Sequence, residues 1–282
     1  MPELPEVETM RRGILSAVGC QIERVEKLPT AVKPLLIVPS ISSMSRRIVG
    51  REIVAVERIG KRVIARLESE DRLIFEPRMT GLVLVADPPS KEHLRFRVDL
   101  SGGVLDTIWY WDRRGLGSVK LFSPTRFEAE VASKFGPDAL AVTSELLRDR
   151  LRHSRRPVKV ALLDQKAIAG IGNLYASEIL NVAGVHPTTR CDKLTIAQWR
   201  HVHQATLDVL HAAIEHEGST LSDGTYRNAL NDVGGYQNQH RVYDRTGELC
   251  RTCEHGTVQR IVQAQRSTFF CPKCQSRGRG KR

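Results

Sequence analysis

Residues 51–77 read REIVAVERIGKRVIARLESEDRLIFEP, and they decide the fold because three strand-like runs follow one another with no helix between them. Each run is rich in Val, Ile, Leu or Phe, and the turn-forming stretches IGK and ESED separate them. Four more runs of this kind follow at residues 80–87, 94–100, 103–112 and 117–123. Closely spaced strands without intervening helices are typical of antiparallel sheets. We therefore predict an antiparallel β-sandwich or barrel that ends near Pro124.

Helical patterns flank this strand-rich region on both sides. Before it, residues 4–17 are predicted to form a helix with Pro5 in its first turn and an inner face of Val7, Met10, Ile14 and Leu15. After it, helices are predicted at residues 144–154, 156–165, 173–184 and 195–218. A long polar loop is expected at residues 219–240. The fold class is therefore α+β.

A very short glycine-rich stretch, KAIAGIGN at residues 166–173, joins two of these helices. Asn173 stands at the start of the second helix, where Asn is a favoured N-cap residue. Backbone amides at a helix N-terminus attract anions such as phosphate. A plain turn in a helical hairpin has the same pattern, so the motif alone leaves both interpretations open.

Four of the six cysteines form the pattern C-x2-C-x17-C-x2-C, at Cys250, Cys253, Cys271 and Cys274. Two such pairs of thiolates can complete the tetrahedral shell of a structural zinc ion. A site closed by four cysteines has no open position for a substrate, so we predict one Zn²⁺ ion with a structural role. Cys20 and Cys191 are isolated and are predicted to be small buried side chains.

The charge of the chain is strongly basic, with 43 Lys and Arg against 32 Asp and Glu and a net charge of +11. From Cys250 to Arg282 there are eight Lys and Arg residues and one acidic residue, Glu254. Such a balance fits a polyanionic partner such as DNA, although a basic protein without such a partner is the simpler alternative. The chain has no apolar run long enough for a membrane span and no secretion signal, so we expect a soluble cytoplasmic protein that does not bind membranes.

The first eight residues, MPELPEVE, hold two prolines and three glutamates. Removal of Met1 would expose Pro2 as a secondary amine, and an α-amine is far less protonated at neutral pH than a lysine. Glu3 and Glu6 lie beside this amine and could transfer protons. Acidic residues also favour helix N-termini for electrostatic reasons alone. That simpler explanation accounts for Glu6 and Glu8 but leaves Pro2 and Glu3 unexplained.

Three motifs together resemble the formamidopyrimidine-DNA glycosylase family: MPELPEVETMRRG, GIGNLYASEIL, and the cysteine pairs with QAQRSTFFC. The related endonuclease VIII branch typically has Gly in place of Leu4. The resemblance extends from residue 1 to about residue 275. It implies a catalytic β-sandwich domain at 1–125, a helix–two-turn–helix domain at 126–240, and a zinc finger with a basic tail at 241–282. DNA would bind in the cleft between the halves.

The resemblance also implies an activity in base-excision repair. A damaged purine, such as 8-oxoguanine or a ring-opened formamidopyrimidine, would be flipped out of the duplex. Pro2 would attack C1′ of the sugar and displace the base, and elimination of the 3′ and then the 5′ phosphate would cut the strand. The enzyme is thus expected to be a DNA glycosylase and AP lyase that acts as a monomer on damaged double-stranded DNA in the bacterial cytoplasm.

Several positions match the functional residues of that family. Glu3 matches its proton donor, and Glu6 matches a supporting carboxylate. Lys61 and Arg266 match a hairpin lysine and a finger arginine that are counted with the catalytic residues. Positions that match DNA-binding residues are His93, Arg114, Lys159, Asn173 and Tyr236, with Tyr243 near the same surface.

Two loops depart from the family pattern where a Met, an Arg and a Phe usually fill the space left by the flipped base. The chain reads EPRMTG where HLGMSG is usual, and WDRRGLG where DPRRFG is usual. Met79 and Arg114 match the first two residues, while Leu116 replaces Phe. Leucine can wedge between bases, but it lacks aromatic stacking worth about 1–3 kcal/mol per base.

The sequence leaves the preferred lesion, the opposite base and the contacts of the lesion-capping segment within residues 219–235 undecided. One alternative is an endonuclease VIII-like enzyme for oxidised pyrimidines. The other is a zinc protein that binds damaged DNA without catalysis, which would bind in a salt-sensitive manner but would not cut the strand.

Overall fold

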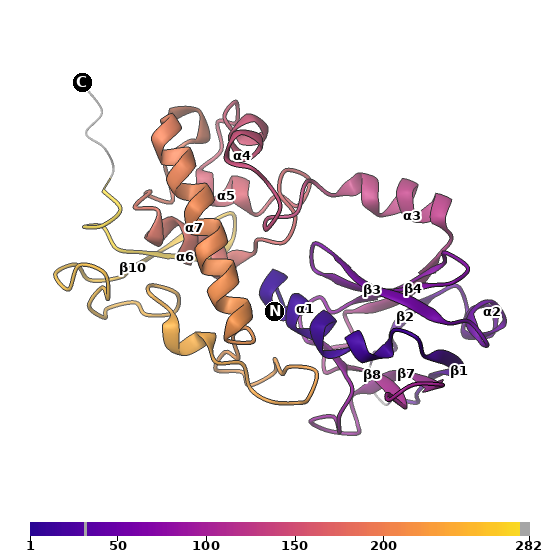
Figure 1. The fold of residues 1–282 in the computed structure, drawn as a ribbon. Coiled ribbons are helices and arrows are strands. Elements are labelled where there is room, and N and C mark those ends of the chain that lie inside the picture. Colours follow the sequence, from indigo (N-terminus) through magenta and orange to yellow (C-terminus); the bar gives the residue numbers. More distant parts are fainter. Residues whose placement is uncertain (31–32, 277–282) are drawn as a thin grey trace. The chain divides into compact units, whose positions relative to one another are not determined.

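The computed structural model describes residues 1–30 and 33–276 (Figure 1). The chain divides into two compact units. The first holds Met1–Lys134 together with Ile214–Gln237, and the second holds Phe135–Ala213 and the chain from Asn238 onward. The division into three domains at residues 125 and 240 stays a prediction. Four of the eight basic residues counted toward the C-terminus fall in 277–282, outside the described residues.

The first unit contains two β-sheets. The four-stranded sheet has the order β1-β7-β8-β6, with bounds Gln21–Lys27, Leu94–Ser101, Thr107–Asp112 and Gly81–Leu84. The five-stranded sheet has the order β2-β9-β5-β4-β3, with bounds Leu36–Val38, Ser118–Phe122, Arg72–Glu76, Arg62–Leu67 and Ile53–Ile59. All seven predicted strands form. They pair with one another in antiparallel fashion, as predicted, and the short β2, which was not predicted, pairs in parallel with β9.

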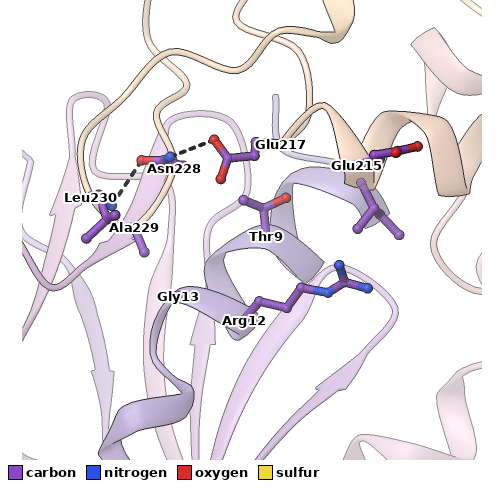
Figure 2. Close-up of a pocket in the computed structure, with 9 residues that line it drawn as sticks. Thr9, Arg12, Gly13, Glu215, Glu217, Asn228, Ala229 and Leu230 are labelled. Atoms are coloured by element: carbon purple, nitrogen blue, oxygen red, sulfur yellow. Dashed lines mark hydrogen bonds between the residues drawn. The ribbon is translucent and has the colours of Figure 1, made fainter.

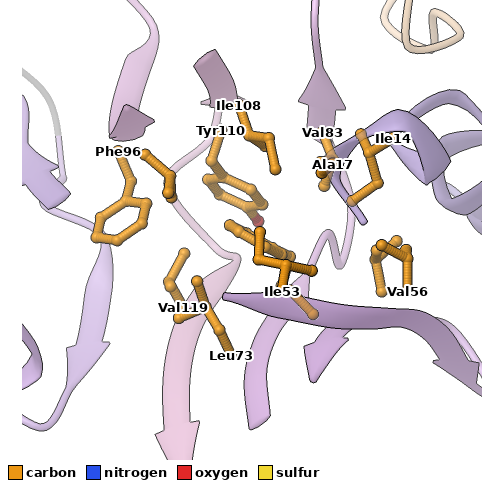
Figure 3. Close-up of a cluster of buried hydrophobic side chains, with 14 of the residues drawn as sticks. Ile14, Ala17, Ile53, Val56, Leu73, Val83, Phe96, Ile108, Tyr110 and Val119 are labelled. Atoms are coloured by element: carbon orange, nitrogen blue, oxygen red, sulfur yellow. The ribbon is translucent and has the colours of Figure 1, made fainter. Parts of the chain in front are cut away.

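The two sheets face each other across one apolar core (Figure 3). Phe75 of β5 stacks on Tyr110 of β8, with ring centroids 6.0 Å apart. The Tyr110 hydroxyl donates a hydrogen bond to the backbone oxygen of Glu76 at 2.9 Å, so this buried polar group is satisfied. Residues with period-two spacing, such as Val63 and Ala65 of β4, supply the rest of this core.

The N-terminal helix α1 spans Leu4–Gly13, and a short 3₁₀ helix η1 continues it at Leu15–Ala17. Pro5 lies in the first turn, as predicted, and Val7, Met10 and Ile14 are fully buried. Leu15 is 43% exposed, so its predicted place on the inner face is wrong. The change from α to 3₁₀ geometry after Gly13 alters the angle between successive side chains, which turns Leu15 outward.

The sequence patterns missed β1, β2 and two helices of the first unit. Helix α2 spans Ile41–Ile48, and Ser40 caps it by accepting a hydrogen bond from the Ser43 amide at 3.4 Å. Helix α3 spans Pro124–Glu130, followed by the 3₁₀ helix η2 at Ala132–Lys134. Arg72 of β5 stacks on the ring of Phe127, 4.5 Å from its centroid, so α3 packs on the five-stranded sheet.

The second unit is built on the predicted helices. Their bounds are Ser144–Leu151 for α4, Val158–Leu162 for α5, Asn173–Val182 for α6 and Ile196–Glu215 for α7, whose last two residues belong to the first unit. A short 3₁₀ helix forms at Cys191–Lys193 (η3), and another at Tyr236–Gln239 (η4), where the chain passes from the first unit to the second. Gly172 is the N-cap of α6, so the prediction of Asn173 as the cap is wrong. Asn173 occupies the first helical position, which releases its side chain for contacts described below.

The segment after η4 carries the cysteine pairs and a two-stranded hairpin. Strands β10 (Gln259–Gln263) and β11 (Arg266–Phe270) pair in antiparallel fashion, as predicted, and Arg266 follows the turn. Ala264 and Gln265 in that turn both have positive φ angles, which is the geometry of a type I′ turn. In the described part of the chain, no helix combines the length and the apolar character that a bilayer crossing requires.

Candidate functional site

The N-terminal turn of α1 places Pro2, Glu3 and Glu6 in the interior of the first unit. Pro2 is buried, and Glu3 and Glu6 are 3% and 2% exposed. The Glu3 amide donates to Oε2 of Glu6 at 2.9 Å, and the Glu3 side chain accepts from the Glu6 amide. This reciprocal capping box satisfies two amides that a helix start leaves without partners. It also gives Glu6 the helix-capping role that the simpler explanation predicts.

Glu6 also binds the chain segment that follows α7. Its Oε1 accepts a hydrogen bond from the Ser219 amide at 2.8 Å. The Tyr226 hydroxyl donates to the backbone oxygen of Glu217 at 2.9 Å and lies 3.5 Å from that of Glu6. One buried carboxylate therefore links the start of α1 to residues more than two hundred positions later.

The segment 216–236 is a long loop whose two ends are tied together. The Gly235 amide donates to the His216 oxygen at 2.8 Å, and the Tyr236 amide donates to the Gly218 oxygen at 2.9 Å. Gly218 has a φ of +81°, and a Cβ there would lie 2.9 Å from both Cγ and Oε1 of Glu6. Glycine is thus required at this position both for its backbone conformation and for its close approach to Glu6.

Behind this loop lies a pocket of about 490 Å³, shown in Figure 2. Asn228 shapes it by donating to Oε2 of Glu217 at 2.9 Å and accepting from the Leu230 amide at 3.0 Å. The pocket is lined by Thr9, Arg12, Gly13, Ile214, Glu215, Glu217, Asn228, Ala229 and Leu230. None of the residues predicted to be catalytic lines it, so the pocket is separate from the N-terminal turn.

An ion-pair cluster connects α1 to the turn that carries Lys61. Glu8 accepts from Arg11 at 2.8 Å and from Nε of Arg58 at 3.0 Å. Burial raises the pKa of Glu8, but the hydrogen bonds and charges of Arg11 and Arg58 outweigh it and lower the pKa to about 2. Arg58 also donates from Nη1 to the oxygen of Gly60 at 2.9 Å. Lys61 therefore stands in the β3–β4 turn, as predicted, next to a backbone held by Arg58.

The residues predicted to fill the DNA void lie on two adjoining loops. Asp112 joins the loops: its Oδ1 accepts from the Thr80 hydroxyl at 2.5 Å and from the Arg114 amide at 3.1 Å. Its Oδ2 accepts from the Gly117 amide at 2.8 Å. Met79 and Leu116 are each 37% exposed, and Arg114 is exposed as well. Hydrogen bonds to Asp112 thus join two loops, which expose the apolar side chains of Met79 and Leu116 and the cationic side chain of Arg114.

His93 lies close to the same loops. Its ring meets that of Trp111 edge-on, with centroids 5.4 Å apart, and its Nε2 is 3.1 Å from a carboxylate oxygen of Glu92. Its backbone oxygen accepts from the Asp112 amide at 2.9 Å. His93 is therefore held against the strand that leads into the Arg114 loop.

In the second unit, the structure brings Lys159, Asn173 and the finger hairpin together. Lys159 is fully buried and donates from Nζ to Oδ1 of Asn173. Asn173 in turn donates from Nδ2 to the backbone oxygen of Ser267 at 3.0 Å. Arg266, the neighbour of Ser267, is exposed. A continuous chain of contacts thus runs from α5 through α6 to the start of β11.

Glu178 was missed by the sequence reasoning although it lies within the quoted motif GIGNLYASEIL. It is fully buried, and its carboxylate accepts from the amides of Arg241, Val242 and Tyr243 at 2.8–3.0 Å. Burial raises its pKa, and the three amide hydrogen bonds oppose that rise. An acidic residue among the apolar residues of the helix predicted at 173–184 was the signal that could have found it.

The two tyrosines predicted near the DNA backbone have different surroundings. Tyr243 packs its ring on Phe269 of β11, with centroids 5.0 Å apart, in the second unit. Tyr236 is 4% exposed and belongs to the first unit, where its ring lies 6.4 Å from that of His216.

The four cysteines of the finger meet the geometric demands of a zinc site. Their sulfur atoms all lie within 4.8 Å of one another, with Cys250–Cys274 at 3.7 Å and Cys253–Cys271 at 3.8 Å. Tetrahedral zinc with Zn–S bonds of about 2.3 Å sets its sulfurs about 3.8 Å apart. Amide hydrogen bonds from His255 and Gly256 lower the pKa of Cys253 to about 6, whereas burial raises the pKa of Cys271 and of Cys274, so the fit to a metal rests on the sulfur geometry. The residues present therefore fit Zn²⁺.

Three family models match successive parts of the chain. The formamidopyrimidine-DNA glycosylase N-terminal domain matches residues 1–119, and the formamidopyrimidine-DNA glycosylase H2TH domain matches residues 135–225. The zinc finger found in FPG and IleRS matches residues 247–277. Together these matches cover most of the chain.

Similar proteins were also found along the full length of the chain. It is 40% identical to the formamidopyrimidine-DNA glycosylase of Chloroflexus aurantiacus over 98% of both chains. It is 36% identical to the enzyme of that name from Bacillus subtilis, over 98% of this chain and all of that one.

Solved structures share the fold. A Lactococcus lactis FPG mutant in complex with a Fapy-dG containing DNA superimposes with a TM-score of 0.85 at 32% identity, and the MutM (FPG) protein of Thermus thermophilus with 0.84 at 34%. In both comparisons 98% of this chain and 100% of the other are covered. With all three family models in order and relatives above 30% identity over nearly its whole length, the chain belongs to the formamidopyrimidine-DNA glycosylase family.

Proposed function

We propose that this chain removes oxidised purines, namely 8-oxoguanine and formamidopyrimidines, from double-stranded DNA and then cuts the strand as an AP lyase. The observation that carries the proposal is the buried N-terminal turn, where Pro2 stands beside Glu3 and the capping carboxylate of Glu6. The family to which the chain belongs supports the substrate class. A relative in complex with a Fapy-dG containing DNA supports duplex DNA as the partner.

The proposed chemistry begins when removal of Met1 frees the Pro2 nitrogen as a secondary amine. This nitrogen bonds to C1′ of the flipped nucleotide, the bond from C1′ to the base breaks, and Glu3 supplies the proton that the leaving group needs. The Pro2 nitrogen then gives up its own proton, and the C1′–O4′ bond of the sugar breaks as O4′ takes up a proton. The iminium ion formed in this way acidifies the proton on C2′. Loss of that proton expels the 3′ phosphate, and a second elimination expels the 5′ phosphate. Water then releases Pro2 from the sugar fragment.

Other residues hold the DNA in this proposal. Lys61, His93, Lys159, Asn173, Tyr236 and Arg266 bind the backbone around the lesion, and Met79, Arg114 and Leu116 fill the space that the flipped base leaves. Phosphate contacts position DNA without selecting a sequence, which suits an enzyme that searches any sequence for damage. One structural Zn²⁺, held by Cys250, Cys253, Cys271 and Cys274, keeps the finger hairpin in place. The enzyme acts as a monomer in the bacterial cytoplasm.

Borohydride trapping on an 8-oxoguanine duplex tests the role of Pro2. The mature protein should form a stable covalent adduct, and mass spectrometry should place it on the N-terminal residue. Pro2→Gly should weaken both base removal and strand cutting. A variant with a blocked N-terminus should form no adduct, because an amide nitrogen is not a nucleophile. Undiminished trapping in the blocked variant would falsify the assignment of Pro2.

Two further measurements distinguish the proposed function from the two alternatives. Faster excision from a thymine-glycol duplex than from an 8-oxoguanine duplex would instead indicate an enzyme for oxidised pyrimidines. Tight, salt-sensitive binding with no strand cutting on either duplex would indicate a damage-binding protein without catalysis. Glu3→Gln should lose base removal while it still forms an adduct on a pre-formed abasic site, because no base has to leave there.

A further inference from the structure

A cluster of cations surrounds one carboxylate on the five-stranded sheet. Glu76, at the end of β5, accepts from Nη2 of Arg62 at 2.6 Å and lies 3.0 Å from Nε of Arg78 and 3.9 Å from Nζ of Lys120. Three positive charges thus share a single negative one. The excess of positive charge favours an anionic partner at this surface.

Arg78 is the member of this cluster that solvent reaches most freely. Its side chain is 59% exposed, against 23% for Arg62 and 29% for Lys120. Its backbone has a φ of +53°, a conformation that side chains disfavour and that glycine adopts freely. Arg78 thus combines a disfavoured backbone conformation with a largely exposed, charged side chain.

The position of Arg78 is set by the void-filling loops. The Gly81 amide donates to the Pro77 oxygen at 2.8 Å and closes a tight turn, so Arg78 and Met79 stand together in it. Thr80 of the same turn is bonded to Asp112 and accepts from the Arg114 amide at 3.0 Å. Arg78 therefore stands next to the exposed Met79, in the turn that Thr80 and Asp112 join to the Arg114 loop.

We propose that Arg78 is a phosphate-binding residue of the void-filling loops, and that Glu76 holds its guanidinium ready for a backbone phosphate of the DNA. This inference rests on the proposed function, since it assigns Arg78 to the DNA-binding surface of the same site. When DNA binds, the Arg78 guanidinium contacts a phosphate oxygen, either in place of the Glu76 carboxylate or together with it. The contact increases affinity for DNA independently of its sequence.

Salt dependence of DNA binding measures this contact directly. Each neutralised phosphate contributes a slope of about −0.9 to log K against log salt concentration on duplex DNA. Removal of Arg78 should therefore reduce the steepness of that slope by about 0.9, and the affinity advantage of the unaltered protein should shrink by about 3.5-fold between 50 and 200 mM salt. The same change is expected on an undamaged duplex and on one with a stable abasic-site analogue.

Two variants and a matched control keep the test decisive. Arg78→Gly suits the positive φ angle and removes the side chain, while Arg78→Gln keeps the length and removes the charge. Arg24→Ala is the control, because Arg24 is equally exposed at 59%, is paired with Glu26, and lies on β1 at the sheet edge opposite β6. It changes the net charge by the same amount and should leave the slope unchanged.

An unchanged slope in both Arg78 variants overturns the proposal, and so does an equal change in Arg24→Ala, which would indicate a general effect of charge. The measurement needs binding alone and is independent of catalysis. If borohydride trapping fails while the slope changes as expected, the assignment of Pro2 fails and that of Arg78 stands.

Discussion

At Gly218 the backbone conformation and the N-terminal turn of α1 depend on each other. Its φ of +81° allows the loop after α7 to approach Glu6, and the neighbouring Ser219 amide can then donate to that carboxylate. Glu6 in turn caps the helix whose first turn contains Glu3. A substitution at Gly218 should therefore displace the proposed catalytic residues, although those residues themselves are unaltered.

We expect Gly218→Ala to lower the rate of base removal, on the order of 100-fold, because displaced catalytic groups lose their alignment with the substrate. Gly19→Ala is the matched control, since Gly19 has a similar φ of +87° and a Cβ added there would meet no atom within 4 Å. Both changes should cost about 1–2 kcal/mol of folding free energy from the backbone conformation. Single-turnover excision assays with thermal unfolding separate the two effects, and equal activity loss in both variants would contradict the role of Gly218.

At the scale of elements, α1 and the β3–β4 hairpin are joined by Glu8 and Arg58. Arg58 is 8% exposed at its side chain and spans the distance from Glu8 to the oxygen of Gly60. The helix that bears Pro2 and the turn that bears Lys61 are thereby set relative to each other. The second unit has a comparable element contact, in which Glu178 of α6 holds the backbone at residues 241–243.

The Glu8 ion pairs predict a defined pH dependence of stability. The folded state lowers the pKa of Glu8 from 4.5 to about 2, so its stabilisation is complete above pH 4.5 and disappears as the pH falls to about 2. Glu8→Gln should therefore unfold more easily than the unaltered protein at pH 7, and the difference should vanish near pH 2.

Glu57→Gln is the control for that experiment. Glu57 pairs with Arg66 on neighbouring strands but is 42% exposed, and such pairs contribute only about 0.2–1 kcal/mol. Denaturant unfolding from pH 7 to pH 2 measures both variants. A difference for Glu8→Gln that stays constant over this pH range would rule out the ion pairs as its source.

At the scale of the whole molecule, the zinc centre and the helices of the second unit depend on each other. Gln275, next to Cys274, accepts from the Asn181 side chain at 2.9 Å and donates to the Val185 oxygen at 2.9 Å. Asn173 reaches Ser267 from the other side of the hairpin. Hydrogen bonds thus hold the finger to the helices at its hairpin and beside its second cysteine pair. The four sulfurs bring the two cysteine pairs together.

We expect Cys253→Ser to lose bound zinc and most of the DNA affinity, because a short cysteine-rich segment has too little core to fold without its metal. The sheets of the first unit should keep their structure. Metal analysis and DNA titration check this, and zinc restored after chelation should recover binding in the unaltered protein. Cys191→Ser should keep its zinc, since Cys191 is buried away from the centre and burial raises its pKa to about 11. Full DNA affinity in zinc-free protein would contradict the expectation.

Much of the architecture could be predicted because its signals are local. Seven strands, four helices of the second unit and the finger hairpin follow from hydrophobic period and turn residues in continuous segments. The elements that were missed have weak local signals: β2 has three residues and depends on its pairing with β9. The exposure of Leu15 and the capping of α6 by Gly172 also escaped prediction, because each depends on where a helix changes its geometry by one residue.

The sequence alone determined the chemistry that is available: a proline behind the initiator methionine, two glutamates beside it, four cysteines at zinc spacing and a large excess of positive charge. Spacing and residue type suffice for these, since they depend on groups that are close along the chain. Only the tertiary structure decided that Glu6 binds Ser219, that Asp112 joins the Met79 and Arg114 loops, and that Glu76 pairs with Arg62 of the neighbouring strand. These contacts join residues far apart in sequence or on separate strands, and no local pattern encodes the packing that brings them together.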